Sequence, residues 1–263
     1  MSTKEEEYVQ KIKAKLSKYP KVLKMFELLE NNAEIQAYIV AANQMAVTRL
    51  GYNDHGRMHS LIASNNSIDI FEILTKSVTP NLVKEKLGTY EDSLLVSFTA
   101  TYLHDIGHVV HRVEHNFWSV IFSRPILEEL LAKIYNDIVL RTHVLSGIVH
   151  GIFTHDESQQ SLTVEAGIVK LADGTDIAEG RSRIPYSLGK VDIHSVSALA
   201  IKEVHILKGE TRPLKILIEM ENPAGIFQVE YILGRKLNTS GLVNYVDLAV
   251  FVNGKEIQLS NFY

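Results

Sequence analysis

Apolar residues recur at helical spacing along the first third of the chain. Residues 4–32 alternate charged side chains with apolar ones, and Pro20 divides this segment into two predicted helices because proline cannot continue the hydrogen bonding of a helix interior. Residues 34–50 predict a further amphipathic helix, and residues 61–74 predict another. Residues 75–91 are polar and contain proline and glycine, which favours a loop or a short helix.

A mostly apolar run, residues 94–103, has the length and composition of a buried helix. It leads directly into His104 and Asp105. Burying two ionisable groups is unfavourable unless something compensates them, and a divalent metal would compensate both. Adjacent residues of a helix point about 100° apart, so these two side chains converge on one ion most easily if the helix ends or bends there. Gly107 permits such a break.

The pattern changes near Val204. Residues 204–206 and 214–220 predict strands, residues 224–237 predict a helix more weakly, and residues 246–252 predict a strand that the Asn-Gly pair 253–254 turns back as a hairpin. We therefore expect a mainly α fold with two domains, residues 1–203 and a small α+β appendage at 204–263. The appendage carries no cluster of catalytic residue types, so its expected role is packing or subunit association, which implies a homo-oligomer.

Composition narrows the possible partners. The chain has 263 residues, of which 46% are hydrophobic, so it can bury a sizeable core. A formal net charge of −4 gives no global basic field, so neither a nucleic acid polymer nor a membrane is an expected partner. The N-terminus is charged where a signal peptide needs an apolar core, and no run approaches the length of a membrane span. We expect a cytoplasmic protein.

The absence of cysteine limits the chemistry of any metal site. Disulfides and thiolate ligands are excluded, and histidine and carboxylate remain as strong ligands. Imidazole and carboxylate together suit a divalent transition metal such as manganese, iron, zinc, nickel or cobalt, whereas an all-oxygen set suits magnesium.

The helix ending in His-Asp-Ile-Gly-His at 104–108 resembles the HD-domain metal-dependent phosphohydrolase superfamily. The resemblance covers roughly residues 50–185 and implies a helical bundle that binds one or two metal ions. His59 occupies the place of the superfamily's first metal-binding histidine, and His55 shares its face if the helix already includes it. Asp173, in an Ala-Asp pair after an apolar helical run, resembles the aspartate that closes the metal site. The alternative is that Asp173 caps a helix or turn beside Gly174.

Other histidines are candidates for a second ion. The resemblance implies a ligand after the His-Asp pair, and His115 is the candidate there. His150 and His155 are both candidates later in the chain, and the sequence does not rank them. His108 and His111 are candidates for contacting phosphate or supporting the ligands, or they are simply solvated.

Three further polar side chains follow. Asp176 is a candidate for orienting a ligand or the attacking water. Arg181 and Arg183 flank a serine, and arginines beside a metal site suit bidentate phosphate binding. A solvated turn with salt bridges is the alternative for this pair.

These features together predict a metal-dependent phosphohydrolase. A metal-activated water would attack the phosphate ester of a nucleotide or another small phosphorylated metabolite, with His108, Asp176, Arg181 and Arg183 assisting. Two alternatives remain open, a di-iron oxygenase that uses similar ligands and a non-catalytic module that binds a nucleotide.

Overall fold

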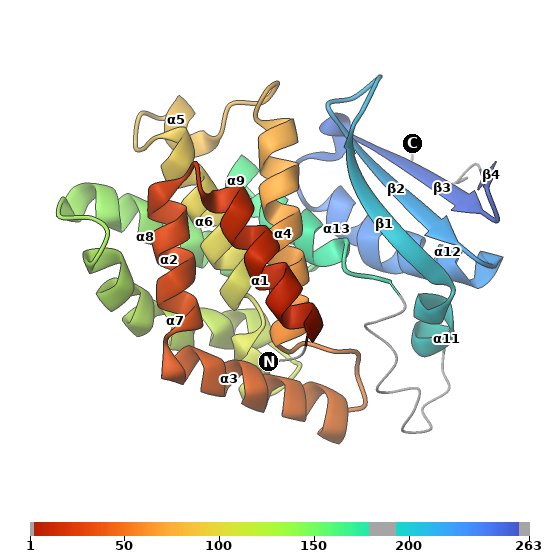
Figure 1. The fold of residues 1–263 in the computed structure, drawn as a ribbon, viewed down its shortest axis with the longest axis horizontal. Coiled ribbons are helices and arrows are strands. Elements are labelled where there is room, and N and C mark those ends of the chain that lie inside the picture. Colours follow the sequence, from red (N-terminus) through yellow and green to blue (C-terminus); the bar gives the residue numbers. More distant parts are fainter. Residues whose placement is uncertain (1–2, 179–192, 258–263) are drawn as a thin grey trace.

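The computed structural model describes residues 3–178 and 193–257. Helices form one part of the molecule, and a four-stranded sheet with short helices of its own forms the other (Figure 1). The prediction of a mainly α fold with a small C-terminal α+β unit is therefore confirmed. The helices of the first part are α1 (Thr3–Leu16), α2 (Pro20–Glu30), α3 (Ala33–Asn43), α4 (Arg57–Leu74), α5 (Asn81–Lys84), α6 (Tyr90–Leu103), α7 (His115–Ala132), α8 (Ile138–Thr154) and α9 (Val164–Gly174).

The helical part is built around α6. Every residue of α6 from Asp92 to Leu103 is buried, and α2, α4, α8 and α9 all contact it. Its start is fixed by a capping box, in which the Thr89 hydroxyl accepts from the Asp92 backbone amide and the Asp92 carboxylate accepts from the Thr89 amide. A helix that is apolar all round needs partners on every side, and this one has them.

The helix ends where the sequence predicts. His104 follows the last residue of α6, and a short 3₁₀ helix, Ile106–Val109, replaces a further α-helical turn. A Cβ atom on Gly107 would lie 2.0 Å from the backbone oxygen of His115 and 2.3 Å from the backbone nitrogen of Ser119. Only glycine therefore lets α7 pack directly against this turn.

The N-terminal helices follow the prediction closely. Pro20 is the first residue of α2, where its missing N–H is harmless. The helix expected over residues 34–50 is α3 followed by a π-helical turn, Gln44–Arg49. None of the helices in the described part of the chain has the length and apolarity that a bilayer span requires.

The C-terminal unit contains the sheet and the chain segments that cover it. Strands β1 (Ile201–Lys208) and β2 (Leu214–Met220) pair antiparallel, and β2 pairs in parallel with β3 (Val246–Val252). Strand β4 (Lys255–Ile257) pairs antiparallel with β3 through a turn whose residues Asn253 and Gly254 both have positive φ, as the Asn-Gly pair predicts. Strand β1 begins upstream of the expected Val204, and α11 (Ile193–Leu199) precedes it and contacts it.

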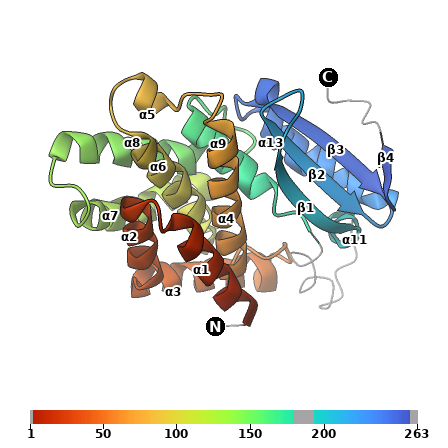
Figure 2. The same ribbon diagram turned by 45° about the horizontal axis from the view of Figure 1, so that its top comes forward.

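The parallel crossover between β2 and β3 is helical. It runs through a 3₁₀ turn (Pro223–Gly225), α12 (Ile226–Gln228), a π-helical turn (Val229–Gly234) and α13 (Arg235–Asn238), which is the region where the sequence favours a helix. Helix α13 contacts α9, and α4 contacts β1 and β2 (Figure 2). The C-terminal unit is thus packed against the two helices that carry His59 and Asp173.

Buried polar contacts strengthen this packing. Lys170 of α9 is fully buried, and its Nζ donates to the Thr239 backbone oxygen at 3.1 Å and the Thr239 hydroxyl at 2.9 Å. A Cβ on Gly167 would lie 2.4 Å from the Ser240 backbone oxygen. Backbone therefore lies directly on backbone where α9 meets residues 239–242.

We expect Gly167→Ala to destabilise the protein by about 1–3 kcal/mol, because the added methyl group must push apart two well-packed backbone segments. Urea unfolding would measure the loss. Gly88→Ala is the matched control, since a Cβ there meets nothing closer than 3.3 Å. Equal unfolding free energies for the two variants would contradict the direct contact between α9 and Ser240.

Candidate metal centre

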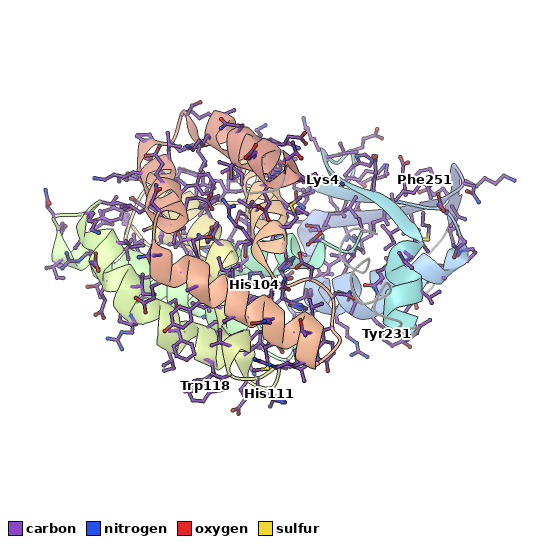
Figure 3. All side chains as sticks on the ribbon, turned by 60° about the horizontal axis from the view of Figure 1, so that its bottom comes forward. Lys4, His104, His111, Trp118, Tyr231 and Phe251 are labelled. Carbon is purple, nitrogen blue, oxygen red and sulfur yellow. The ribbon has the colours of Figure 1, made fainter. Side chains whose placement is uncertain are left out.

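In the described part of the chain, six buried histidine and aspartate side chains, bordered by the equally buried His108 and Asp176, meet where the ends of five helices come together. Figure 3 shows His104 inside the helical part, whereas His111 lies at its edge. The six come from the start of α4 (His59), the end of α6 (His104 and Asp105), the start of α7 (His115), the end of α8 (His155) and the last turn of α9 (Asp173).

Four of these side chains form a first group. Nε2 of His59 and Nε2 of His104 are 3.1 Å apart. Oδ2 of Asp105 lies 3.5 Å from the first nitrogen and 3.2 Å from the second. Oδ1 of Asp173 lies 3.4 Å and 3.6 Å from the same two atoms. Ligands about 2.0–2.2 Å from a common ion are themselves about 3–3.6 Å apart, so the spacing of this group fits one transition-metal ion.

The other oxygen of Asp105 belongs to a second group. Its Oδ1 lies 3.5 Å from Nε2 of His115 and 3.6 Å from Nε2 of His155. These two nitrogens are 2.9 Å apart. A single carboxylate thus offers one oxygen to each group, which is the arrangement that two neighbouring ions require.

The outer nitrogens of the histidines are held by acceptors. Nδ1 of His104 donates to the Thr101 carbonyl at 2.7 Å, and Nδ1 of His155 donates to the Ile152 carbonyl at 2.6 Å. Nδ1 of His59 lies 2.6 Å from the Asp176 carboxylate. Because carbonyl and carboxylate oxygens only accept, these contacts place the proton on Nδ1 and aim Nε2 into the cluster. Metal-binding histidines are oriented in this way.

The charges of the cluster are strongly coupled. Burial opposes ionisation of Asp105 and Asp173, yet neighbouring cations, with Lys236 and His104 acting on Asp173, hold the pKa of both carboxyls well below the ordinary value. Burial alone would lower the pKa of His104, but Asp105 and Asp173 raise it to about 10. The metal-free first group therefore retains a proton on His104. Burial lowers the pKa of His115 and His155, which are neutral at pH 7.

His108, a predicted catalytic residue, borders the second group. Its ring stacks on His115 with 4.3 Å between centroids, and its Nε2 lies 3.3 Å from Asp105 Oδ1. The side chain is fully buried, and within residues 3–178 and 193–257 neither ring nitrogen has a hydrogen-bond partner beyond this approach to Asp105. Asp105 Oδ2 likewise has no well-aligned hydrogen bond from these residues. Buried polar atoms without hydrogen bonds are rare, and at this site they fit a place for cations and a polar ligand.

The other candidates have different positions. The Asp176 carboxylate lies 2.6 Å from Nδ1 of His59. His55 donates from Nδ1 to the Asn53 carbonyl at 2.6 Å, and its ring lies 4.7 Å from that of His108. His111 is exposed. Arg181 and Arg183 lie outside the described residues.

The structure does not bring His150 to the cluster. The half-buried ring of His150 accepts a hydrogen bond from the Leu162 amide through Nε2, and none of the metal-ligand groups among residues 3–178 and 193–257 contains it. His150 and His155 are five residues apart near the end of α8, so their side chains leave the helix on different faces. Of these two histidines, His155 lies in the cluster and His150 does not.

Two residues of the site escaped the sequence analysis. Nη1 of Arg112 lies 3.0 Å from His115 Nε2, and the position of Arg112 between candidate histidines was a signal that could have found it. Lys236 of α13 is buried, and its Nζ donates to Asp173 Oδ2 at 2.6 Å and to the His155 carbonyl at 2.9 Å. Nothing in the sequence around Lys236 marks it, because its partners are distant along the chain.

A cavity of about 380 Å³ opens onto the cluster. Its walls include Asp105 and Asp173 from the first group, Arg112 from the loop before α7, and Tyr231 and Lys236 from the C-terminal unit. The labelled Tyr231 lies on the C-terminal side of this region in Figure 3. The volume suits a small molecule that reaches both metal-ligand groups.

Comparisons with known proteins agree with the geometry. The model of the HD domain matches residues 59–178, a range that begins at His59 and ends beyond Asp176. An uncharacterized protein of Methanocaldococcus jannaschii is 41% identical over 230 residues, which cover 87% of this chain and 88% of the relative. No solved structure matches the chain.

We expect the first metal ion to displace about one proton at pH 7. His104 must lose its Nε2 proton to become a ligand, whereas His115 and His155 are already neutral. The affinity for Mn²⁺ should therefore rise with pH, by about tenfold per pH unit around pH 7. Calorimetry in two buffers of different ionisation enthalpy measures the released protons. Metal binding without proton release at pH 7 would contradict this assignment.

The positions of the two α8 histidines predict different effects of substitution. His155→Gln should remove the second ion or weaken its binding by at least about tenfold, because it deletes one of three ligands. His150→Gln, the matched control, should retain the metal content of the wild-type protein. Elemental analysis after loading with Mn²⁺ measures both. A loss of metal in the His150 variant would place that residue in the centre after all.

Proposed function

Because this chain belongs to the HD-domain superfamily of metal-dependent hydrolases, we propose that it is a phosphohydrolase that cleaves the phosphate ester of a nucleotide or another small phosphorylated metabolite. One observation carries the proposal. The Asp105 carboxylate presents one oxygen to each of two histidine-containing groups, at the floor of a cavity large enough for such a substrate.

The donor set suits one or two divalent transition metals such as Mn, Fe, Zn, Ni or Co. His59, His104, Asp105 and Asp173 would hold the first ion, and Asp105, His115 and His155 the second. Ions bound there lower the pKa of water and neutralise the charge of a phosphate group. Which of these metals the protein binds is part of this proposal.

The chain's own side chains support phosphate binding. Arg112 lines the cavity beside the second group, and its guanidinium matches the geometry of phosphate oxygens. His108 is neutral at pH 7 because burial lowers its pKa, and among the described residues its ring nitrogens have no hydrogen-bond partner beyond the 3.3 Å approach of Nε2 to Asp105. We assign it a hydrogen bond to the substrate, since a bound polar group would satisfy it.

Asp176 holds the orientation of the His59 ring, which belongs to the first group. Its carboxylate accepts a hydrogen bond from Nδ1 of His59, which holds the ring with Nε2 toward Asp105 and Asp173. Such a contact increases the basicity of the imidazole. Asp176 thus acts through His59 rather than on the substrate.

The proposal predicts the effect of Asp105→Asn. Replacing the shared carboxylate by an amide of the same shape weakens both metal groups, so we expect phosphatase activity to fall by at least about a thousandfold, because a catalytic ion contributes several kcal/mol to charge stabilisation. The assay follows loss of substrate and formation of product by chromatography for nucleoside mono-, di- and triphosphates, cyclic nucleotides and sugar phosphates, with each candidate metal. Exposed His111→Asn is the control and should match the wild-type protein.

The same assays separate the competing functions. A metal-loaded protein that is inert on the whole panel would contradict the proposal. Oxygen uptake by the iron-loaded protein without hydrolysis of any phosphate ester would favour an oxygenase instead. Nucleotide binding without turnover would favour a regulatory module.

A further inference from the structure

Lys236, in helix α13 of the C-terminal unit, has its ammonium group at the candidate metal centre. Lys236 belongs to the crossover between β2 and β3, outside the residues that match the HD domain. Only 10% of its side chain is exposed. Burying a lysine is unfavourable without a specific partner, so its two contacts require an explanation.

Each contact of Lys236 concerns a different metal group. Its Nζ donates at 2.6 Å to Oδ2 of Asp173, the oxygen that does not face His59 and His104. The same nitrogen donates at 2.9 Å to the backbone oxygen of His155. One ammonium group therefore touches a candidate ligand of the first ion and a candidate ligand of the second.

These contacts control how the ligands face the centre. Because Lys236 engages Oδ2, Asp173 presents only Oδ1 to the first group. Because Lys236 also binds the His155 carbonyl, the backbone that carries this ring is held where α8 ends. The neighbouring Ile152 carbonyl holds the ring itself through Nδ1.

The residues around Lys236 leave space for its side chain. A Cβ on Gly174 would lie 3.1 Å from Cδ of Lys236 and 3.2 Å from Cδ1 of Leu233. The glycine after Asp173 thus leaves room for the lysine stem. One turn earlier on α9, Lys170 fixes the end of α13 through the Thr239 oxygens without touching any candidate ligand.

We propose that Lys236 is a positioning residue of the metal centre, through which the C-terminal unit holds Asp173 and His155 in place for the two ions. The inference rests on the metal centre of the proposed function, but it assigns the C-terminal unit a part in the site. From the sequence alone, the expected role of that unit is packing or subunit association.

The first test is the Mn²⁺ affinity of Lys236→Met, measured by competition with a chelating dye. Loss of a residue that orients a ligand typically lowers metal affinity by 10- to 100-fold, and we expect a loss in that range. Lys170→Met is the matched control, because it removes a buried lysine from the same interface and should leave the affinity within about twofold of the wild-type value. Lys236→Gln, which keeps a donor without the charge, serves if the methionine variant does not fold.

A second test separates the ammonium group from simple packing. The chain contains no cysteine, so Lys236→Cys introduces a single thiol. Alkylation of the unfolded variant with 2-bromoethylamine, followed by refolding, attaches an aminoethyl group that restores a lysine-like side chain. Alkylation with iodoacetamide attaches a neutral amide instead. We expect the first product to recover wild-type Mn²⁺ affinity within about threefold and the second to remain at least about tenfold weaker.

The outcomes separate this inference from the proposed function. Unchanged Mn²⁺ affinity in the Lys236→Met or Lys236→Gln variant, or equal affinity of the two alkylated products, would overturn the role of Lys236 whether or not the protein is a phosphatase. Metal affinity that depends on Lys236 in a protein without phosphatase activity would support the inference and reject only the proposed reaction.

Discussion

The burial of two carboxylates among histidines is the constraint on which the rest of the structure depends. Asp105 and Asp173 are almost fully buried, and an isolated charge in such a place is strongly unfavourable. The chain compensates them with imidazoles from four helix ends and with one ammonium group. Each of these groups must arrive at a precise position, so the lengths and packing of the helices are tied to this cluster.

Helix α6 ends at Leu103, directly before His104 and Asp105. Its apolar surface is packed on all sides, which leaves its C-terminal end as the point where polar groups emerge. Gly107 then lets α7 approach closely enough for Ser119 to accept from the Gly107 amide and donate to the His104 carbonyl. The same close approach brings His115 beside Asp105. One glycine therefore links the end of α6 to the second ligand group.

The C-terminal unit belongs to the site as well as to the fold. Lys170 and Lys236 both lie in the interface between α9 and the crossover after β2, but they face different partners. Lys170 satisfies backbone oxygens and fixes the packing, whereas Lys236 pairs with a carboxylate of the cluster. The unit thus also forms one wall of the cavity that opens onto the cluster. A protein built in this way can change one wall of the cavity without changing the buried histidine and aspartate cluster.

Local pattern was enough to predict most elements of the fold. The helices split by Pro20, the buried helix 94–103 and the Asn-Gly hairpin follow from rules that act over a few residues, and the structure has them. The π-helical turn after α3 and the early start of β1 were not predicted, because both depend on how these segments pack against distant ones. The first and last residues of a helix or strand depend on such packing, whereas the periodic spacing of apolar residues within it does not.

The sequence by itself determined the chemistry of the centre, because a cysteine-free chain with histidines around a His-Asp pair offers only imidazole and carboxylate to a metal. Only the tertiary structure decided which histidines meet. His150 and His155 are alike in sequence, but the end of α8 turns just one of them toward Asp105. The sequence did not predict a role for Lys236 for the same physical reason. Its contact with Asp173 joins residues 63 positions apart. No local sequence pattern encodes such a contact, because only tertiary packing creates it.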